Sequence, residues 1–169
     1  MYVPFDQMPD EARVWIYQAD QKISTAHHDI IAGILQHFTG QWAAHGVPLR
    51  TSFLILDDHF IVLAVDEKYN NASGCSIDSS VHVVKEVMEK TAINFFNREQ
   101  VAFKADEGVR FISMKELKRK YEEGVWQGHT QTFNTLASTA GDIRTKWLLP
   151  AENSWLKRFI PKAHAMNDQ

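Results

Sequence analysis

The amino-acid sequence predicts an α+β fold with an antiparallel sheet in the ferredoxin-like (split βαβ) order β-α-β-β-α-β. Two segments repeat apolar residues at helical spacing, and runs rich in β-branched and aromatic residues lie before and after them. These patterns predict two main helices and a C-terminal helical extension. With 44% apolar and 23% charged residues, the composition is that of an ordinary globular protein. We expect a single α+β domain over residues 1–161 and a disordered tail over 162–169.

The first strand and the first helix are predicted from neighbouring segments. ARVWIYQA, residues 12–19, is rich in β-branched and aromatic residues, which favour a strand. From Thr25 to Trp42, apolar residues follow one another at three- and four-residue steps, which places one face of a helix against a core. Ser24 or Thr25 is expected to cap the start of this helix, and Gly46 to end it.

A hairpin and a second helix continue the order. TSFLILDDHFIVLAVDE predicts strands over residues 51–56 and 60–65, joined by a polar turn at Asp57–His59. The stretch NNASGCSIDSSVH, residues 70–82, is small and polar. Apolar residues then return to helical spacing over 81–95, which predicts the second helix.

The C-terminal third is harder to assign. QVAFKADEGVRFISM predicts two more strands, and the first of them would complete the split βαβ sheet. The same residues, 101–103 and 109–114, also suit a separate two-stranded extension. Ser113 and Glu116 have the spacing of a capping box, which predicts a short helix. The amphipathic signal resumes at 146–160, and we expect this segment to pack on the domain rather than on a membrane.

Charge and composition disfavour several classes of protein. The formal net charge is -3, and the eighteen basic residues are spread along the chain, which disfavours nucleic-acid binding. A single cysteine excludes an intramolecular disulfide and a CxxC zinc site. No signal peptide is visible, and the longest apolar run is about a third of the roughly 18 residues that a membrane span needs. We therefore expect a cytoplasmic protein with no membrane partner and no cofactor, and a homo-oligomer stays open.

The predicted topology brings the only cysteine, Cys75, close to other segments. The loop before the second helix shares one end of the sheet with the loop after the first helix, so Cys75 is expected to face His45 and Arg50. Arg13 and Trp42 belong to the same end. Helix-start N–H groups and guanidinium groups attract anions. We expect this loop to bind an anionic small molecule or a partner segment through Ser76, Asp78, Ser79, Ser80, Arg50, Arg13 and Trp42.

Two other functions stay open. A nearby imidazole and guanidinium groups favour a thiolate, so Cys75 as nucleophile and His45 as base would form an enzyme for acyl or amide transfer or hydrolysis. Five tryptophans and an apolar C-terminal segment would suit a structural or adaptor protein. Cysteine is also often buried without a chemical role, and the residues Asp78–Ser80 are types that a helix start prefers.

A rival metal site is expected to be weaker. His27–Asp29 open the first helix and Asp57–His59 fill the hairpin turn, and the topology places both at the opposite end of the sheet. Imidazole and carboxylate groups together can hold a divalent metal. No HxxxH or HExxH spacing supports a site here, so we interpret these residues as solvated polar groups and assign no metal ligand.

Three short strings, RVWIYQAD, QWAAHG and SGCSIDSSV, resemble a family of short bacterial proteins of unknown function, many of which carry the label "ABC transporter ATPase". The resemblance runs along most of the chain. The label does not fit these residues, because the chain has no Walker A phosphate loop and SGCSIDSS is not an LSGGQ-type signature. The resemblance therefore implies a stand-alone cytoplasmic protein and assigns no catalytic residue.

Overall fold

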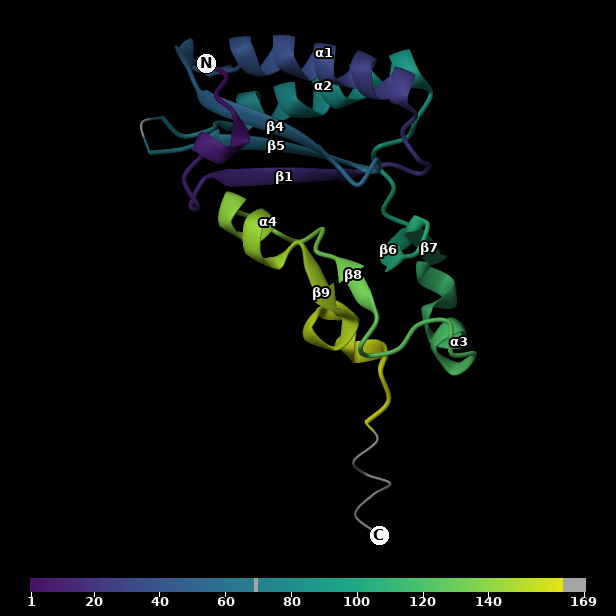
Figure 1. Ribbon diagram of the computed structural model, residues 1–169. Helices are drawn as coiled ribbons and strands as arrows, with labels where there is room; N and C mark the ends of the chain where they lie inside the picture. The colour runs from purple at the N-terminus through teal and green to yellow at the C-terminus, as the bar shows by residue number, and fades with distance from the viewer. Residues whose placement is uncertain (69, 163–169) are drawn as a thin grey trace. The chain divides into compact units, whose positions relative to one another are not determined.

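A three-stranded antiparallel sheet with the order β1-β5-β4 is the centre of the N-terminal part of the protein (Figure 1). Its strands are β1 (Arg13–Gln18), β4 (Arg50–Leu56) and β5 (Phe60–Asp66). All residues of the middle strand, β5, are buried, as its continuous apolar run predicts. In the turn before it, Asp57 and Asp58 both have positive φ angles, of 52° and 53°.

The computed structural model describes residues 1–68 and 70–162, and in it the chain forms two compact units. The first unit holds Met1–Asn97 and Thr135–Trp147, and the second holds Arg98–Asn134 together with the segment that begins at Leu148. A single domain over 1–161 stays a prediction. The predicted tail lies outside the described residues from position 163 onward.

Two long helices cover one face of the first sheet (Figure 1). Helix α1 (Thr25–Gln41) is capped by Ser24 as predicted, because the Ser24 hydroxyl accepts a hydrogen bond from the backbone N–H of His27 at 3.1 Å. Helix α2 (Gly74–Thr91) starts earlier than its apolar pattern indicates. Its core side chains, and those of α1 and the sheet, form one buried cluster that includes Ile31, Leu35, Leu63, Val84 and Val87.

The other face of the same sheet is closed by the N-terminal segment and by the short helix α4 (Ala140–Lys146). The N-terminal segment includes a 3-10 turn, η1 (Phe5–Gln7). This second cluster contains Met8, Ala12, Val62, Ala64, Ala140 and Ile143. Both faces of this sheet are therefore packed against other elements.

The α+β class is confirmed, but the structure does not show the single ferredoxin-like β-α-β-β-α-β sheet. The strand expected to complete it, β6 (Gln100–Ala105), pairs instead with β7 (Gly108–Ser113) in a second sheet. Besides its pairing with β5, β1 forms isolated bridges among the described residues to Thr139 and Phe96, at opposite ends of the strand. Those bridges occupy the edge where a fourth strand would pair.

The end of α1 also differs from the prediction. The helix ends at Gln41, and the next residues form a small hairpin of β2 (Ala43–Ala44) and β3 (Val47–Pro48). His45 and Gly46 make its turn with φ angles of 51° and 76°. Glycine in the left-handed region suits a two-residue hairpin turn as well as a helix end, which is why the sequence signal was misassigned.

The second unit is built on a four-stranded antiparallel sheet with the order β7-β6-β8-β9. Its two short strands are β8 (Gln131–Phe133) and β9 (Leu148–Pro150). The alternative prediction that β6 and β7 pair apart from the first sheet is therefore confirmed, but the sheet has four strands instead of the predicted two, because β8 and β9 add to it. The predicted capping box at Ser113 is wrong, because that side chain makes no capping hydrogen bond.

Short helical turns complete the second unit. The 3-10 turn η2 (Met114–Glu116) leads into helix α3 (Leu117–Glu122), and 3-10 turns η3 (Ala151–Asn153) and η4 (Trp155–Phe159) follow β9. The core of this unit includes Val101, Phe103, Leu117, Trp126 and Leu156. Trp126 donates its indole N–H to the carbonyl of Leu117 at 2.7 Å. Among the described residues, no helix has both the length and the hydropathy needed to cross a membrane.

Candidate functional site

The end of α1 and the start of α2 meet, as the sequence predicts, through Trp42. This side chain is buried and donates its indole N–H to the carbonyl of Ser76 at 2.9 Å. Its ring also packs against Phe38 and Trp15, with ring centroids 4.9 Å and 5.8 Å away. Trp42 therefore belongs to the core and holds the two helices together.

The two arginines expected at this end form ion pairs. Arg50 Nη1 lies 3.0 Å from Asp66 Oδ2, and Asp66 is buried. Arg13 Nη1 lies 3.8 Å from Glu67 Oε1. Asp66 ends strand β5 and Glu67 follows it directly, so both carboxylates are fixed by the strand. The positive charge of each guanidinium group is thus offset by a neighbouring carboxylate.

These carboxylates also organise the loop before α2. Asp66 accepts a hydrogen bond from the backbone N–H of Lys68 at 3.1 Å, and Glu67 accepts one from the N–H of Ala72 at 2.9 Å. Asn70 donates its side-chain amide to the carbonyl of Val47 at 3.2 Å. The loop is therefore tied to β5 and to the β2–β3 hairpin, which carries His45 at the same end.

The serines of the predicted site are used within α2. Ser73 and Ser76 form a capping box, in which each side chain accepts a hydrogen bond from the backbone N–H of the other residue. Ser79 donates to the carbonyl of Cys75 at 3.0 Å. Ser80 donates to the carbonyl of Ile77 at 2.6 Å, and Tyr17 Oη lies 3.2 Å from the same hydroxyl. These hydroxyl groups stabilise the helix start.

The remaining predicted residues lie on the surface. Cys75 is exposed at the second position of α2, and Asp78 is exposed one turn later. His45 is exposed in the hairpin turn. Within residues 1–68 and 70–162, no hydrogen bond joins Cys75 to His45. The structure brings the predicted segments to one end without forming a nucleophile–base pair there.

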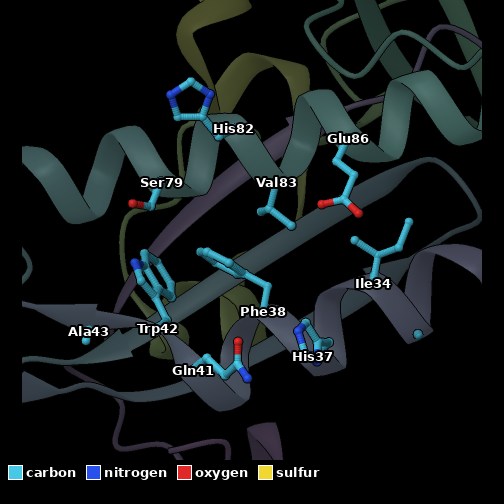
Figure 2. A pocket seen from close by; sticks show the side chains of 11 residues that line it. Ile34, His37, Phe38, Gln41, Trp42, Ala43, Ser79, His82, Val83 and Glu86 are labelled. Carbon is cyan, nitrogen blue, oxygen red and sulfur yellow. The ribbon is translucent and has the colours of Figure 1, made fainter.

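A groove between α1 and α2 has the form of a ligand site (Figure 2). Its volume is about 740 Å³, which lies within the range of roughly 300–1,000 Å³ typical of small-molecule pockets. Two residues of the predicted site, Trp42 and Ser79, are part of its wall. The described residues that line it are Gly33, Ile34, His37, Phe38, Gln41, Trp42, Ala43, Ser79, His82, Val83 and Glu86.

Helical periodicity explains how the sequence builds this groove. Residues four apart lie on the same side of a helix, so Ile34 and Phe38 form an apolar stripe along α1, and Trp42, the residue after the helix, packs against Phe38. A neighbouring stripe on α1 holds Gly33, His37 and Gln41, and a stripe on α2 holds Ser79, His82 and Glu86. In Figure 2, Phe38 and Val83 extend toward each other between the helices. The groove therefore has an apolar floor and a polar rim.

The rim differs from the start of α2 in its hydrogen bonding. Glu86 extends from α2 toward Ile34 on the facing helix, whereas the ring of His82 points away (Figure 2). In the part of the chain that the structure describes, Glu86, His37 and Gln41 form no ion pair or hydrogen bond. Gly33 of α1 borders open space in the groove, since a Cβ atom at this position would meet nothing within 4 Å.

The opposite end of the sheet has a smaller hollow. It is lined in part by His28, Asp29 and Asp58, so the predicted meeting of the α1 start and the hairpin turn is confirmed. Its remaining polar neighbours are Lys22, Ser24 and Thr25. Among the described residues, no three His, Cys, Asp or Glu side chains are placed to hold a metal ion.

Comparison with known proteins adds no relative. No family model matches the chain, and no curated protein and no solved structure matches it.

The sequence reasoning missed the rim of the groove. His37, Gln41, His82 and Glu86 belong to no motif, and they became neighbours only because α1 and α2 pack side by side. The available signal was a polar stripe next to each apolar stripe. Every surface helix carries such a stripe, so it could not have singled out these residues.

Proposed function

We propose that this protein binds a small molecule or a partner segment in the groove between α1 and α2. One observation carries the proposal: an apolar floor with aromatic rings lies beside His37, Gln41 and Glu86, whose side chains have no hydrogen-bond partner among the described residues. An apolar hollow with a few convergent polar groups is the usual form of a ligand site. The groove overlaps the site predicted from sequence at Trp42 and Ser79.

The anionic ligand expected at the start of α2 has less support. Arg13 and Arg50 are each paired with a carboxylate, and the hydroxyl groups of Ser73 and Ser76 already cap the helix. A ligand phosphate or carboxylate at this position would compete with those partners. We therefore place the binding function in the groove and treat the helix start as a structural element beside it.

A matched pair of glycine substitutions tests this location. Gly33 lines the groove, and Gly40 is exposed on the same helix outside it. A Cβ atom would meet nothing within 4 Å at either position, so both sites accept a larger side chain. A thermal-shift screen of metabolites on the wild-type protein supplies the ligands. We expect Gly33→Trp to abolish the ligand-induced rise in Tm and Gly40→Trp to retain it.

The result that contradicts this location is equally specific. A ligand whose thermal shift survives in Gly33→Trp but disappears in Arg50→Ala, a residue outside the groove lining, would bind at the start of α2 instead. A screen in which no metabolite raises the Tm of the wild-type protein would argue against binding of the tested compounds anywhere on the chain.

An enzyme with Cys75 as nucleophile is a second candidate, because the structure leaves this thiol exposed at the start of an 18-residue helix. The proposal requires His45 to act as its base. Alkylation of native protein by iodoacetamide tests it: His45→Ala should slow the reaction of Cys75 at neutral pH, and His82→Ala should not. Equal alkylation rates in the wild type, His45→Ala and His82→Ala would exclude a pair of Cys75 and His45.

The wider setting belongs to the same proposal. A binding function would suit a stand-alone cytoplasmic protein, which is what the resemblance to the bacterial family implies. A homo-oligomer is tested by sedimentation velocity at two protein concentrations, and a structural or adaptor role would require a partner that survives gel filtration with the chain. A strictly monomeric species without a partner would argue against that role.

A further inference from the structure

We infer that the groove between α1 and α2 selects small organic cations that carry an apolar body. This inference rests on the proposed function of the same groove and specifies the chemistry of its ligand. It reverses the charge that the sequence predicts, because the residues that face the ligand here are different ones.

The charge of the groove comes from Glu86. Among the described residues that line the groove, Glu86 is the only Asp, Glu, Lys or Arg. Its carboxylate extends over the floor toward Ile34 (Figure 2). In the described part of the chain it forms no ion pair, even though Lys90 lies one turn further along α2. A ligand cation would supply the missing partner.

The floor favours the same sign of charge. Phe38 and Trp42 lie with ring centroids 4.9 Å apart and ring planes tilted by 37°. Aromatic faces carry negative electrostatic potential and attract cations. Phe38 is only partly buried, so its ring is accessible from the groove, whereas Trp42 is almost fully buried. The apolar body of a ligand would cover Ile34, Phe38 and Val83.

Two hydrogen-bond donors of the groove are already used within the protein, and those of His37 and Gln41 remain. The indole N–H of Trp42 is used by the carbonyl of Ser76, and the hydroxyl of Ser79 is used by the carbonyl of Cys75. No arginine or lysine of the described chain lines the groove. An anion would therefore meet the Glu86 carboxylate with little positive charge to offset the repulsion.

Three indole compounds of the same shape and different charge form the test. Tryptamine is a cation, tryptophol is neutral and indole-3-propionate is an anion, and all three join the ring to the polar group through the same two-carbon chain. Each is titrated into the full-length protein near neutral pH and followed by ¹H–¹⁵N NMR. We expect tryptamine to shift groove resonances of α1 and α2 with a Kd about threefold to tenfold lower than that of tryptophol. Indole-3-propionate should bind most weakly.

A matched pair of variants assigns the selectivity to one carboxylate. Glu86→Gln should reduce the advantage of tryptamine over tryptophol to less than about twofold, since the ion pair is removed while the shape is kept. Glu89→Gln, exposed on the same helix outside the groove, should retain the full advantage. Both substitutions lower the negative charge of α2 equally, so a difference between them reports the position and not the net charge.

Failure of this inference and failure of the proposed function give different results. Indole-3-propionate binding as tightly as tryptamine, or a tryptamine advantage that survives in Glu86→Gln, overturns the cation inference and leaves the groove as a binding site. If no probe shifts a groove resonance and Gly33→Trp responds to metabolites as the wild type does, both are overturned.

Discussion

The start of α2 and the groove beside it are both polar, yet the structure uses their polar groups in opposite ways. At the helix start, Ser73 and Ser76 cap each other, and Arg50 pairs with the buried Asp66. On the rim of the groove, Glu86 and His37 form no hydrogen bond within the described residues. Polar residues that satisfy each other stabilise a fold, whereas those facing a hollow without partners are available to a ligand.

The residue that joins the two regions should have the largest effect on stability. Trp42 is buried and its indole N–H holds the start of α2, so Trp42→Ala removes both a large apolar side chain and a hydrogen bond. We expect a loss of about 3–5 kcal/mol in the free energy of unfolding, measured by urea denaturation. Trp42→Phe keeps most of the apolar volume and should lose clearly less. A loss below about 1 kcal/mol in Trp42→Ala would show that the helices are held together elsewhere.

Breaking the ion pair near the start of α2 should lower the free energy of unfolding less than Trp42→Ala does, but more than a substitution on the surface does. Arg50→Ala leaves the Asp66 carboxylate buried with the Lys68 N–H as a remaining partner. Because Arg50 is itself partly exposed, we expect a loss of about 2 kcal/mol, below the 3–5 kcal/mol typical of fully buried pairs. A double-mutant cycle with Asp66→Asn checks the origin of the effect. Strictly additive losses would mean that the pair does not interact.

The sequence was informative wherever structure depends on local patterns. Strands β1, β4 and β5 and helices α1 and α2 follow the predicted order, because their apolar periodicity is set by near neighbours. The predicted pairing of β6 with the first sheet was wrong, because strand pairing depends on segments that lie far apart in the sequence. Thr139 and Phe96 bridge to the edge of β1, and no local pattern around Gln100 could indicate that.

Which segments of the candidate site lie close together was predictable from the sequence, but the chemistry of the site was not. The topology correctly brought Trp42 to the start of α2, because both lie at one end of the sheet. The predicted site included the positive charges of Arg13 and Arg50 but not the carboxylates of Asp66 and Glu67 at the end of β5. These carboxylates form ion pairs with the two arginines. A cluster of one charge in a sequence therefore says little until the opposite charge has been placed.

Removal of the helix cap should have a moderate effect. Ser73 is the N-cap of α2, and its hydroxyl accepts the backbone N–H of Ser76 at 3.2 Å. Ser73→Ala should lower the free energy of unfolding by about 1 kcal/mol, as is typical of lost caps. Lys85→Ala, an exposed change in the same helix, is the control and should stay within about 0.5 kcal/mol. If both variants lost the same amount, the capping box would not be what stabilises the start of α2.

The smallest effects on stability are expected from substitutions on the rim of the groove. They test whether the rim differs from the start of α2. If Glu86 and His37 contribute to ligand binding and not to the fold, then Glu86→Gln and His37→Gln should each change the free energy of unfolding by less than about 0.5 kcal/mol. Urea denaturation of the ligand-free protein measures this directly. A loss above about 1 kcal/mol in either variant would reveal an intramolecular role for that side chain. The rim would then resemble the helix start, and the groove would lose the feature that distinguishes it as a binding site.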